Sequence, residues 1–398
     1  MPGNQQRPYG GVRLIDLTRE LGSYATRLFA DLGAEVIKIE RPRGQPDRQT
    51  EPHLPDADPQ VFGGAPFAFL NVNKRSVALD IDAPSGRQVP LELIGKSNIV
   101  VIEPGADDGL LAAIVAVPGR RVVTAISYFG LSGPYAHFTG CDLVAQSLGG
   151  IAWLTGEPGK PPLRIAGDQS GFVTSLYAAA ATAIAFWDSE LRDTTHVLDV
   201  SAQECIAHSL QNAPQVFDLE GRVAVRGGER TRDATENSFA CQDGFVFLAA
   251  PLSLPMSWTG LVNWLREENC PGAERLLDAD WLDRPKRATE SMKREFRSLF
   301  EKFLSDKPAQ AIAAEALRRK VVLAPVSRIS DLPLNPQLVF RRYFRKVYVP
   351  ALGRELQFPG APYRLSEPVW NIERAAPRLG QDTDDVLAPL RGAKSAGA

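Results

Sequence analysis

The residues with the clearest chemical potential are one carboxylate and the two glycines that flank it. Gly167-Asp168-Gln-Ser-Gly171 follows a Pro/Gly-rich loop and opens a long alanine-rich stretch that ends near Trp187. An aspartate at the start of a helix lies beside the positive end of the helix dipole and several free N–H groups. Because the glycines lack side chains, a carbonyl carbon can approach Asp168 closely, and the amides can stabilise an oxyanion.

A carboxylate in this setting can act as a nucleophile. Its attack on a thioester gives a mixed anhydride, which suits the passing of an acyl group between a thiol and another carboxylate. The alternative is structural, since an aspartate that precedes a helix is most often simply an N-cap. The local sequence leaves both roles open for Asp168.

Other catalytic motifs are missing from the sequence. No G-x-G-x-x-G follows the first predicted strand, Lys160 of a Walker-like stretch is followed by proline, and Gly130-Leu-Ser-Gly133 lacks the spacing of a nucleophile elbow. The four histidines have no metal-ligand spacing; they are His53, His137, His196 and His208. These absences count against nucleotide hydrolysis, dinucleotide redox chemistry and serine hydrolysis, and they favour carboxylate chemistry.

The elements that must position Asp168 alternate between strand-like and helix-like segments. Residues 23–32 form an amphipathic stretch with a serine cap and a glycine stop, which predicts a helix. Short apolar, β-branched runs predict a buried strand at residues 12–17 and further strands at 35–40, 76–81, 98–103, 121–128 and 196–201. This alternation predicts an α/β fold with a mostly parallel, Rossmann-like sheet.

The pattern changes after about residue 220. Residues 221–232 are polar and glycine-rich, which is typical of a linker, and Asp243-Gly244 predicts a hairpin turn within residues 238–251. Helices are predicted at 287–304 and 308–320, and strands at 321–327, 343–349 and 355–358. We therefore predict a large domain (1–205 plus 322–398), a linker (206–229) and a small α+β domain (230–321).

Composition places the chain among ordinary globular proteins. It has 398 residues, of which 44% are hydrophobic and 23% charged, and its net charge is -2. That balance argues against nucleic acid and basic membrane-surface partners.

The longest apolar stretch, residues 176–187, suits a buried core helix better than a membrane span. The N-terminus lacks a signal peptide's pattern. Four widely spaced cysteines fit neither disulfides nor zinc. We expect a cytoplasmic protein.

Several short motifs, in order over most of the chain, resemble the class III coenzyme A transferases, the formyl-CoA transferase and carnitine dehydratase-like family. The matching segments are GVRLIDLT (11–18), YATRLFADLGAEVIKIER (24–41), NKRSVALD (73–80), FGLSGPY (129–135), residues 142–155, the Gly167–Gly171 motif, Asp243-Gly244, PGAPYRL (359–365) and APRLGQDTDDVL (376–387). The resemblance implies a Rossmann-like large domain, a small domain, and a homodimer whose chains interlock. It also implies an acyl-CoA donor and a carboxylic acid acceptor as substrates, with no permanently bound cofactor.

The resemblance also implies roles for individual residues. Asp168 would be the catalytic nucleophile, which is converted to an aspartyl-CoA thioester. Glycines on the acyl side of the site would be Gly149, Gly150 and Gly167. The residues that would contact coenzyme A are Leu21, Arg41, Leu79, Asp80, Ile81, Thr139, Cys141 and Asp142.

The chain departs from the family pattern at two places. The family's Glu-Asn-Phe-Arg-Pro-Gly stretch is reduced here to Glu103-Pro-Gly105, so the loop's Asn, Phe and Arg are missing. Related racemases carry a histidine where this chain has Cys141, which we expect to be a small buried residue, so racemisation is disfavoured. A CoA-ester isomerase or racemase, and a diverged member that binds an acyl compound or partner without catalysis, are the alternatives.

Overall fold

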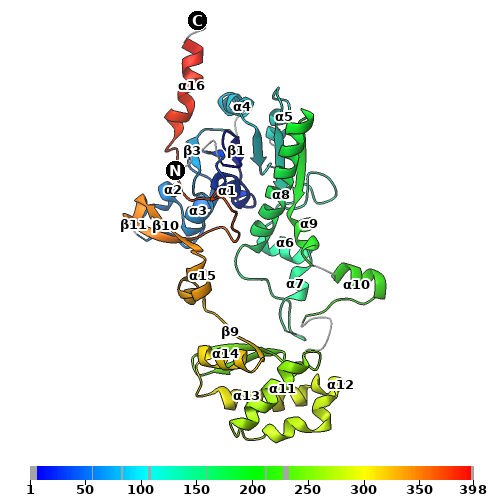
Figure 1. Cartoon of the computed structure of the whole chain (residues 1–398). Coiled ribbons are helices and arrows are strands. Elements are labelled where there is room, and N and C mark those ends of the chain that lie inside the picture. Colours follow the sequence, from blue (N-terminus) through cyan, green and yellow to red (C-terminus); the bar gives the residue numbers. More distant parts are fainter. Residues whose placement is uncertain are drawn as a thin grey trace. The chain divides into compact units, whose positions relative to one another are not determined.

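The computed structural model describes residues 7–55, 57–81, 84–105, 109–157, 159–210, 213–226 and 233–395. The chain divides into two compact units (Figure 1). The larger unit comprises residues 1–155, 162–222 and 337–398, and the smaller unit comprises residues 156–161 and 223–336.

A six-stranded parallel sheet forms the centre of the larger unit, in the order β3-β2-β1-β4-β5-β6. Its strands are β1 (Arg13–Leu17), β2 (Glu35–Glu40), β3 (Arg75–Ala78), β4 (Ile99–Ile102), β5 (Val122–Ser127) and β6 (His196–Ser201). All six predicted strands of this sheet are therefore confirmed, and the parallel α/β fold with them. The strand order reverses between β1 and β4, where sheets of this kind bind ligands beyond their carboxyl ends.

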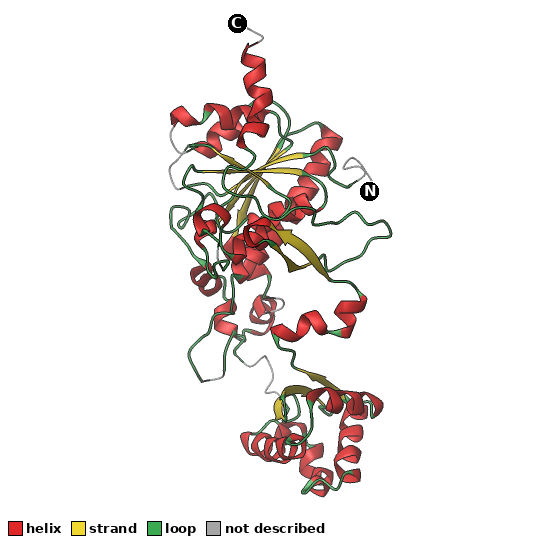
Figure 2. Cartoon of the chain, turned by 90° about the vertical axis from the view of Figure 1, so that its left-hand side faces the viewer, coloured by secondary structure: helices red, strands yellow, loops and turns green. Residues whose placement is uncertain are grey.

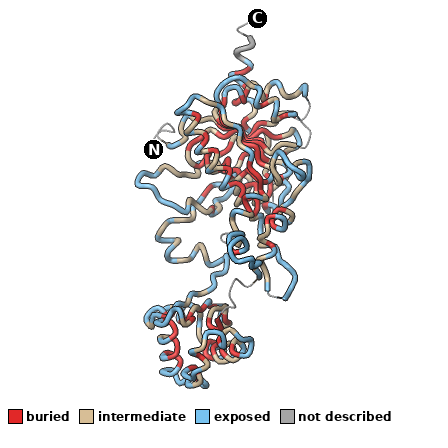
Figure 3. The backbone as a smooth tube through the Cα atoms, turned by 90° about the vertical axis from the view of Figure 1, so that its right-hand side faces the viewer, coloured by how far each residue is buried: buried red, intermediate tan, exposed pale blue. Residues whose placement is uncertain are grey.

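Helices cover both faces of this sheet (Figure 2), and its strands lie in the buried centre of the larger unit (Figure 3). Successive strand residues alternate between two apolar cores. On one face pack α1 (Ser23–Asp31), α6 (Asp142–Leu148), α8 (Gln169–Arg192) and α9 (Ala202–His208). On the other face pack α4 (Gln88–Gly95), α5 (Leu110–Val115) and α16 (Thr383–Ser395). Burial on both faces explains why the inner strands β1, β4 and β5 read as mainly apolar runs.

Short elements complete the larger unit. They are α2 (Pro59–Phe62), α3 (Ala65–Leu70), α7 (Ile151–Leu154), α10 (Ala213–Glu220), α15 (Pro336–Phe340) and the antiparallel pair β10 (Phe344–Val349) and β11 (Arg354–Pro359). The helix α10 occupies part of the segment that the sequence predicted as a linker, and α9 ends inside that segment too.

The smaller unit contains an antiparallel sheet in the order β7-β8-β9, formed by β7 (Asn237–Cys241), β8 (Gly244–Ala249) and β9 (Val322–Pro325). Its helices are α11 (Pro255–Glu267), α12 (Arg284–Arg287), α13 (Glu290–Leu304) and α14 (Ala309–Arg318). The hairpin at Asp243-Gly244 is confirmed. Because β9 pairs with β8, residues 322–325 belong to the smaller unit, whereas the sequence prediction returned them to the large domain.

Candidate active site

Asp168 is the N-cap of α8. Its side-chain Oδ1 accepts a hydrogen bond from the backbone N–H of Gly171 at 3.3 Å. The preceding Gly167 has φ +82°, a conformation that favours glycine. Asp168 as a whole residue is exposed to solvent in this chain. The predicted helix start is therefore confirmed, and the structural and chemical roles of Asp168 are compatible with each other.

Gly171 provides the space in which the carboxylate lies. A Cβ built on Gly171 would stand 2.2 Å from Asp168 Oδ2 and 2.9 Å from its Cγ. Both distances are shorter than any van der Waals contact, so only glycine at this position accommodates the observed carboxylate orientation.

The surroundings of Asp168 raise its pKa to about 6. Desolvation by neighbouring protein atoms is the main cause, and the nearby carboxylates of Asp142 and Glu20 add to it, while the Gly171 N–H acts in the opposite direction. A carboxylate with this pKa is still mostly ionised at neutral pH. It is also more basic than an ordinary aspartate and hence a better nucleophile.

Asp142, predicted as a coenzyme A contact, holds the loop that carries Asp168. Its Oδ1 accepts hydrogen bonds from the backbone N–H and hydroxyl of Ser170 at 3.0 and 2.9 Å. Its Oδ2 accepts from Gln146 at 2.8 Å and from Arg164 at 3.2 Å. Because both oxygens are engaged, Asp142 acts in this chain as a positioning residue for the start of α8.

Several of the predicted coenzyme A contacts lie at the carboxyl edge of the sheet. Leu21 follows β1, Arg41 follows β2, and residues 79–81 follow β3, and these three strands are neighbours. Glu40 and Ala78 are paired in register, so Arg41 and Leu79 emerge side by side. The parallel register thus gathers segments that are 20 to 60 residues apart in the sequence.

A cavity of about 530 Å³ opens at the reversal of strand order. Its walls come from the loops after β1, β4 and β5, namely residues 19–21, 103–105, 126–128 and 136–140, with Thr139 among them. Arg41, residues 79–81, Cys141 and Asp142 do not line it. The cavity occupies the place where doubly wound sheets bind ligands.

Glu103 is an organising residue that the sequence reasoning did not identify. Its carboxylate accepts hydrogen bonds from the backbone N–H groups of Glu20 and Gly22 at 2.9 and 2.8 Å. A Cβ on Gly22 would stand 2.6 Å from Thr18 Cγ2, so this turn also requires glycine. Burial raises the pKa of Glu103, and the N–H donors oppose that rise. Its position directly after β4 was the available signal.

A tyrosine–glutamate pair in the cavity wall was also missed. The Tyr128 hydroxyl donates to Glu20 Oε2 at 3.1 Å, and both residues line the cavity. Burial and the adjacent Glu20 charge raise the pKa of Tyr128 well above its usual range. Gly140 packs flat against the tyrosine ring, since a Cβ there would stand 2.3 Å from Tyr128 Cγ.

Two other predicted site glycines and Cys141 have local structural explanations. A Cβ on Gly149 would stand 2.5 Å from Ile206 Cγ2, so Gly149 allows α6 to pack on α9. Gly150 has φ +91° and separates α6 from α7. The prediction that Cys141 is buried was wrong: it is exposed and precedes α6.

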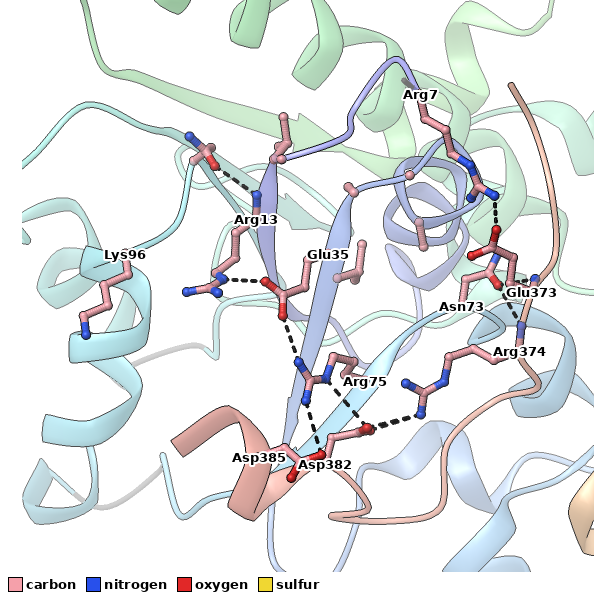
Figure 4. A pocket seen from close by; sticks show the side chains of 17 residues that line it. Arg7, Arg13, Glu35, Asn73, Arg75, Lys96, Glu373, Arg374, Asp382 and Asp385 are labelled. Carbon is pink, nitrogen blue, oxygen red and sulfur yellow. Dashed lines mark hydrogen bonds and ion pairs between the residues drawn. The ribbon is translucent and has the colours of Figure 1, made fainter. Parts of the chain in front are cut away.

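A second cavity, of about 730 Å³, lies at the amino edge of the same sheet (Figure 4). Arg75 bridges Glu35 and Asp382 there, at 2.9 and 3.7 Å, and Arg13 and Arg374 each pair with one of these carboxylates. The charges within these ion pairs neutralise each other, and the pairs that include Asp382 link the C-terminal segment to the sheet. We therefore assign this cavity a structural role.

The described residues were compared with the requirements of a metal centre and of a membrane-spanning helix. Within the described ranges, no group of three or more His, Cys, Asp and Glu side chains could hold a metal ion. The described residues include one helix, α8, that is long and apolar enough to cross a membrane. Core helices of soluble proteins meet the same criterion, and α8 packs against α1, α9, β5 and β6.

Comparisons with solved structures agree with this fold. A CaiB/BaiF family protein from Brucella suis has a TM-score of 0.84 at 22% sequence identity, covering 96% of this chain and 99% of that one. The protein Rv3272 from Mycobacterium tuberculosis has a TM-score of 0.74 at 20% identity, covering 95% of this chain and 99% of that one. At these identities the likeness shows the fold alone.

Sequence comparisons identify the family. The subunit BbsE of succinyl-CoA:(R)-benzylsuccinate CoA-transferase from Thauera aromatica is 33% identical over 381 residues, which cover 94% of this chain and 92% of that protein. Succinate–glutarate CoA-transferase from Agrobacterium fabrum is 26% identical, covering 97% and 96%. The family model for CoA-transferase family III matches residues 9–383. The chain is therefore a member of CoA-transferase family III, a family of CoA-transferase enzymes.

Proposed function

We propose that this enzyme moves coenzyme A from an acyl-CoA donor to a second carboxylic acid, with Asp168 as the covalent nucleophile. The observation that carries the proposal is the setting of Asp168. The carboxylate is accessible at the N-terminus of α8, has a raised pKa, and lies in a space that Gly171 leaves open.

The reaction consists of four acyl transfers. An Asp168 oxygen attacks the donor's thioester carbon, so that a C–O bond forms and the C–S bond breaks. The CoA thiolate is released, and the acyl group remains on Asp168 as a mixed anhydride. The thiolate then attacks the aspartyl carbonyl, which releases the donor acid and gives an aspartyl-CoA thioester. The acceptor carboxylate attacks that thioester, expels the thiolate and forms a second anhydride. Attack of the thiolate on the acceptor's carbonyl gives the new CoA ester and regenerates Asp168.

The chain can stabilise the oxyanions of these steps at the start of α8. The N–H groups of Ser170 and Gly171 are already bound by Asp142 and Asp168. Among the described residues, the N–H of Gln169 has no acceptor, so it is available to an oxyanion beside Asp168. Gly167, without a side chain, leaves the approach to the carboxylate open.

For coenzyme A we propose the carboxyl edge of the sheet as its binding region. The cavity at the strand-order reversal is walled by residues 19–21 and 136–140, and the Arg41 guanidinium at the end of β2 suits a phosphate. Leu21 is held to α8, because the Ser175 hydroxyl donates to its carbonyl at 2.5 Å. That contact connects the cavity wall to the helix that Asp168 caps.

The relatives suggest the class of acid. The two curated relatives named above are a succinyl-CoA:(R)-benzylsuccinate and a succinate–glutarate CoA-transferase. We propose that this enzyme takes succinyl-CoA as donor and a dicarboxylic acid as acceptor.

We also propose that the enzyme is a cytoplasmic homodimer. Large apolar side chains on α8 are more than half exposed, including Ile184 (72%), Trp187 (66%) and Leu191 (68%). An exposed apolar surface of this kind on a soluble chain is typical of a protein interface. Light scattering coupled to gel filtration would detect the dimer, and a monomer at micromolar concentration would contradict it.

Intact-protein mass spectrometry after incubation with succinyl-CoA and a panel of other acyl-CoAs tests the chemistry. We expect an adduct on Asp168 that hydroxylamine removes and that the Asp168→Asn variant cannot form. If no donor gives an adduct and calorimetry detects no CoA binding, the chain is a binding protein that has kept the fold and lost the reaction.

A further inference from the structure

A third cavity, of about 780 Å³, lies on the larger unit and contains an unusual number of arginines. Arg341, Arg342, Arg345 and Arg364 line it, and the sole carboxylate among its lining residues is Glu367. None of the four guanidinium groups forms an ion pair with a described residue, although Arg364 donates to a backbone carbonyl at 3.4 Å. The cavity at the amino edge differs, since acidic partners neutralise its arginines (Figure 4).

The antiparallel pair β10–β11 builds this cavity from two distant segments. Phe344 pairs with Pro359, and the Gly360 N–H donates to the Tyr343 carbonyl at 2.9 Å. Residues 338–345 and 361–370 therefore leave the same end of the hairpin and face one another across the cavity. The arginines lie on both segments, so a ligand between them can be held from two sides.

Aromatic side chains contribute four residues to the apolar part of the lining. They are Phe340, Tyr343, Tyr363 and Trp370. Trp370 is anchored, because its side chain hydrogen-bonds the buried Asp31. Aromatic faces pack against apolar or planar groups and attract cations. They carry no net charge, however, and therefore do not neutralise the arginines.

Like charges without counter-ions in one cavity repel each other, and an anion that enters relieves that repulsion. Guanidinium groups bind carboxylates and phosphates in bidentate fashion. One carboxylate cannot engage four guanidinium groups at once, so the cavity favours a ligand with two negative charges. The volume is in the range of small-molecule sites, roughly 300–1,000 Å³.

We propose that this cavity is a binding site for an organic dianion with an apolar or aromatic body, and specifically for a dicarboxylic acid. The anion site follows from the cavity alone; the choice of a dicarboxylate over a nucleotide rests on the proposed function. Asp168 is not among the residues that line the cavity, so the cavity gives the enzyme a second place to recognise acids.

Calorimetric titration of the full chain tests this assignment, with phenylsuccinate, succinate and adenosine 3′,5′-bisphosphate as probes. We expect phenylsuccinate to bind more tightly than succinate, because only phenylsuccinate engages the aromatic side chains. Arg345→Gln and Arg364→Gln should each weaken phenylsuccinate binding at least about tenfold. Arg354→Gln, an exposed arginine on β11 outside the cavity, is the matched control and should bind as the parent does.

Four results would overturn the proposal. The first is that phenylsuccinate fails to bind, and the second is that the two arginine variants bind it as the parent does. The third is that the bisphosphate binds more tightly with the same arginine dependence, which assigns a nucleotide. The fourth is that the arginine variants change the oligomeric state, which assigns an interface. Repeating the titration with Asp168→Asn separates this site from the chemistry: binding should persist in that variant even if no covalent adduct ever forms.

Discussion

Replacing Gly171 by alanine should inactivate the enzyme without unfolding it. The alanine keeps the backbone N–H that donates a hydrogen bond to Asp168, but its Cβ would stand 2.2 Å from Asp168 Oδ2. Restoring an ordinary contact of roughly 3.4 Å moves the carboxylate by about 1 Å, and a misplacement of that size costs on the order of 100-fold in rate.

Stability should change little, because the clashing group is the end of a movable side chain. Alanine also favours the helix by up to about 1 kcal/mol relative to glycine. The assay is single-turnover formation of the hydroxylamine-sensitive adduct, together with a thermal melt.

Gly95→Ala in α4 is the matched control, since its Cβ meets only Val117 at 3.7 Å. If Gly171→Ala forms the adduct within about threefold of the parent rate, the observed carboxylate position is not the reactive one and the reasoning fails.

Four further outcomes are expected. The rate kcat/KM should fall below about pH 6, because only ionised Asp168 attacks; a flat profile from pH 5 to 8 would contradict this. Because the pKa of Asp168 is raised in the folded state, the parent loses stability as pH rises from about 4 to 6. The variant Asp168→Asn still caps α8 and should therefore have a higher Tm than the parent at pH 7.5 but not at pH 4. Equal melting temperatures at both pH values would argue against the raised pKa. Glu103→Gln should raise KM for the CoA ester about tenfold, because the loop at Gly22 loses an acceptor; an unchanged KM would show that the loop is held otherwise. Arg287→Met should cost about 3–5 kcal/mol in urea unfolding, because it leaves buried Asp233 unpaired; a loss below 1 kcal/mol would refute that.

Local sequence patterns predicted the elements and the position of Asp168. Strands buried on both faces are largely apolar, so they were visible at residues 35–40 and 98–103. The start of α8 was visible because Gly-Asp-Gln-Ser-Gly combines a cap with a run of helix-forming alanines. These signals lie within about ten residues, and periodicity and capping act over that range.

Some local predictions were wrong where the sequence signal was weak. Residues 213–220, inside the predicted linker, lack glycine and form the helix α10, which the sequence analysis did not predict. Cys141 is exposed because it precedes the first turn of α6 and does not lie on the helix's packed face. In both cases tertiary packing, rather than composition, decides the environment.

The arrangement of the site was decided by tertiary structure. Strand order brings the ends of β1 and β4 together, and only then does Glu103 meet the N–H groups at Glu20 and Gly22, more than 80 residues away. The hydrogen bond from the Ser170 N–H to Asp142 likewise depends on how α6 packs beside α8. Sequence therefore determined which residue could be the nucleophile, whereas the fold determined what holds it, because hydrogen bonds between distant segments leave no periodic trace in the chain.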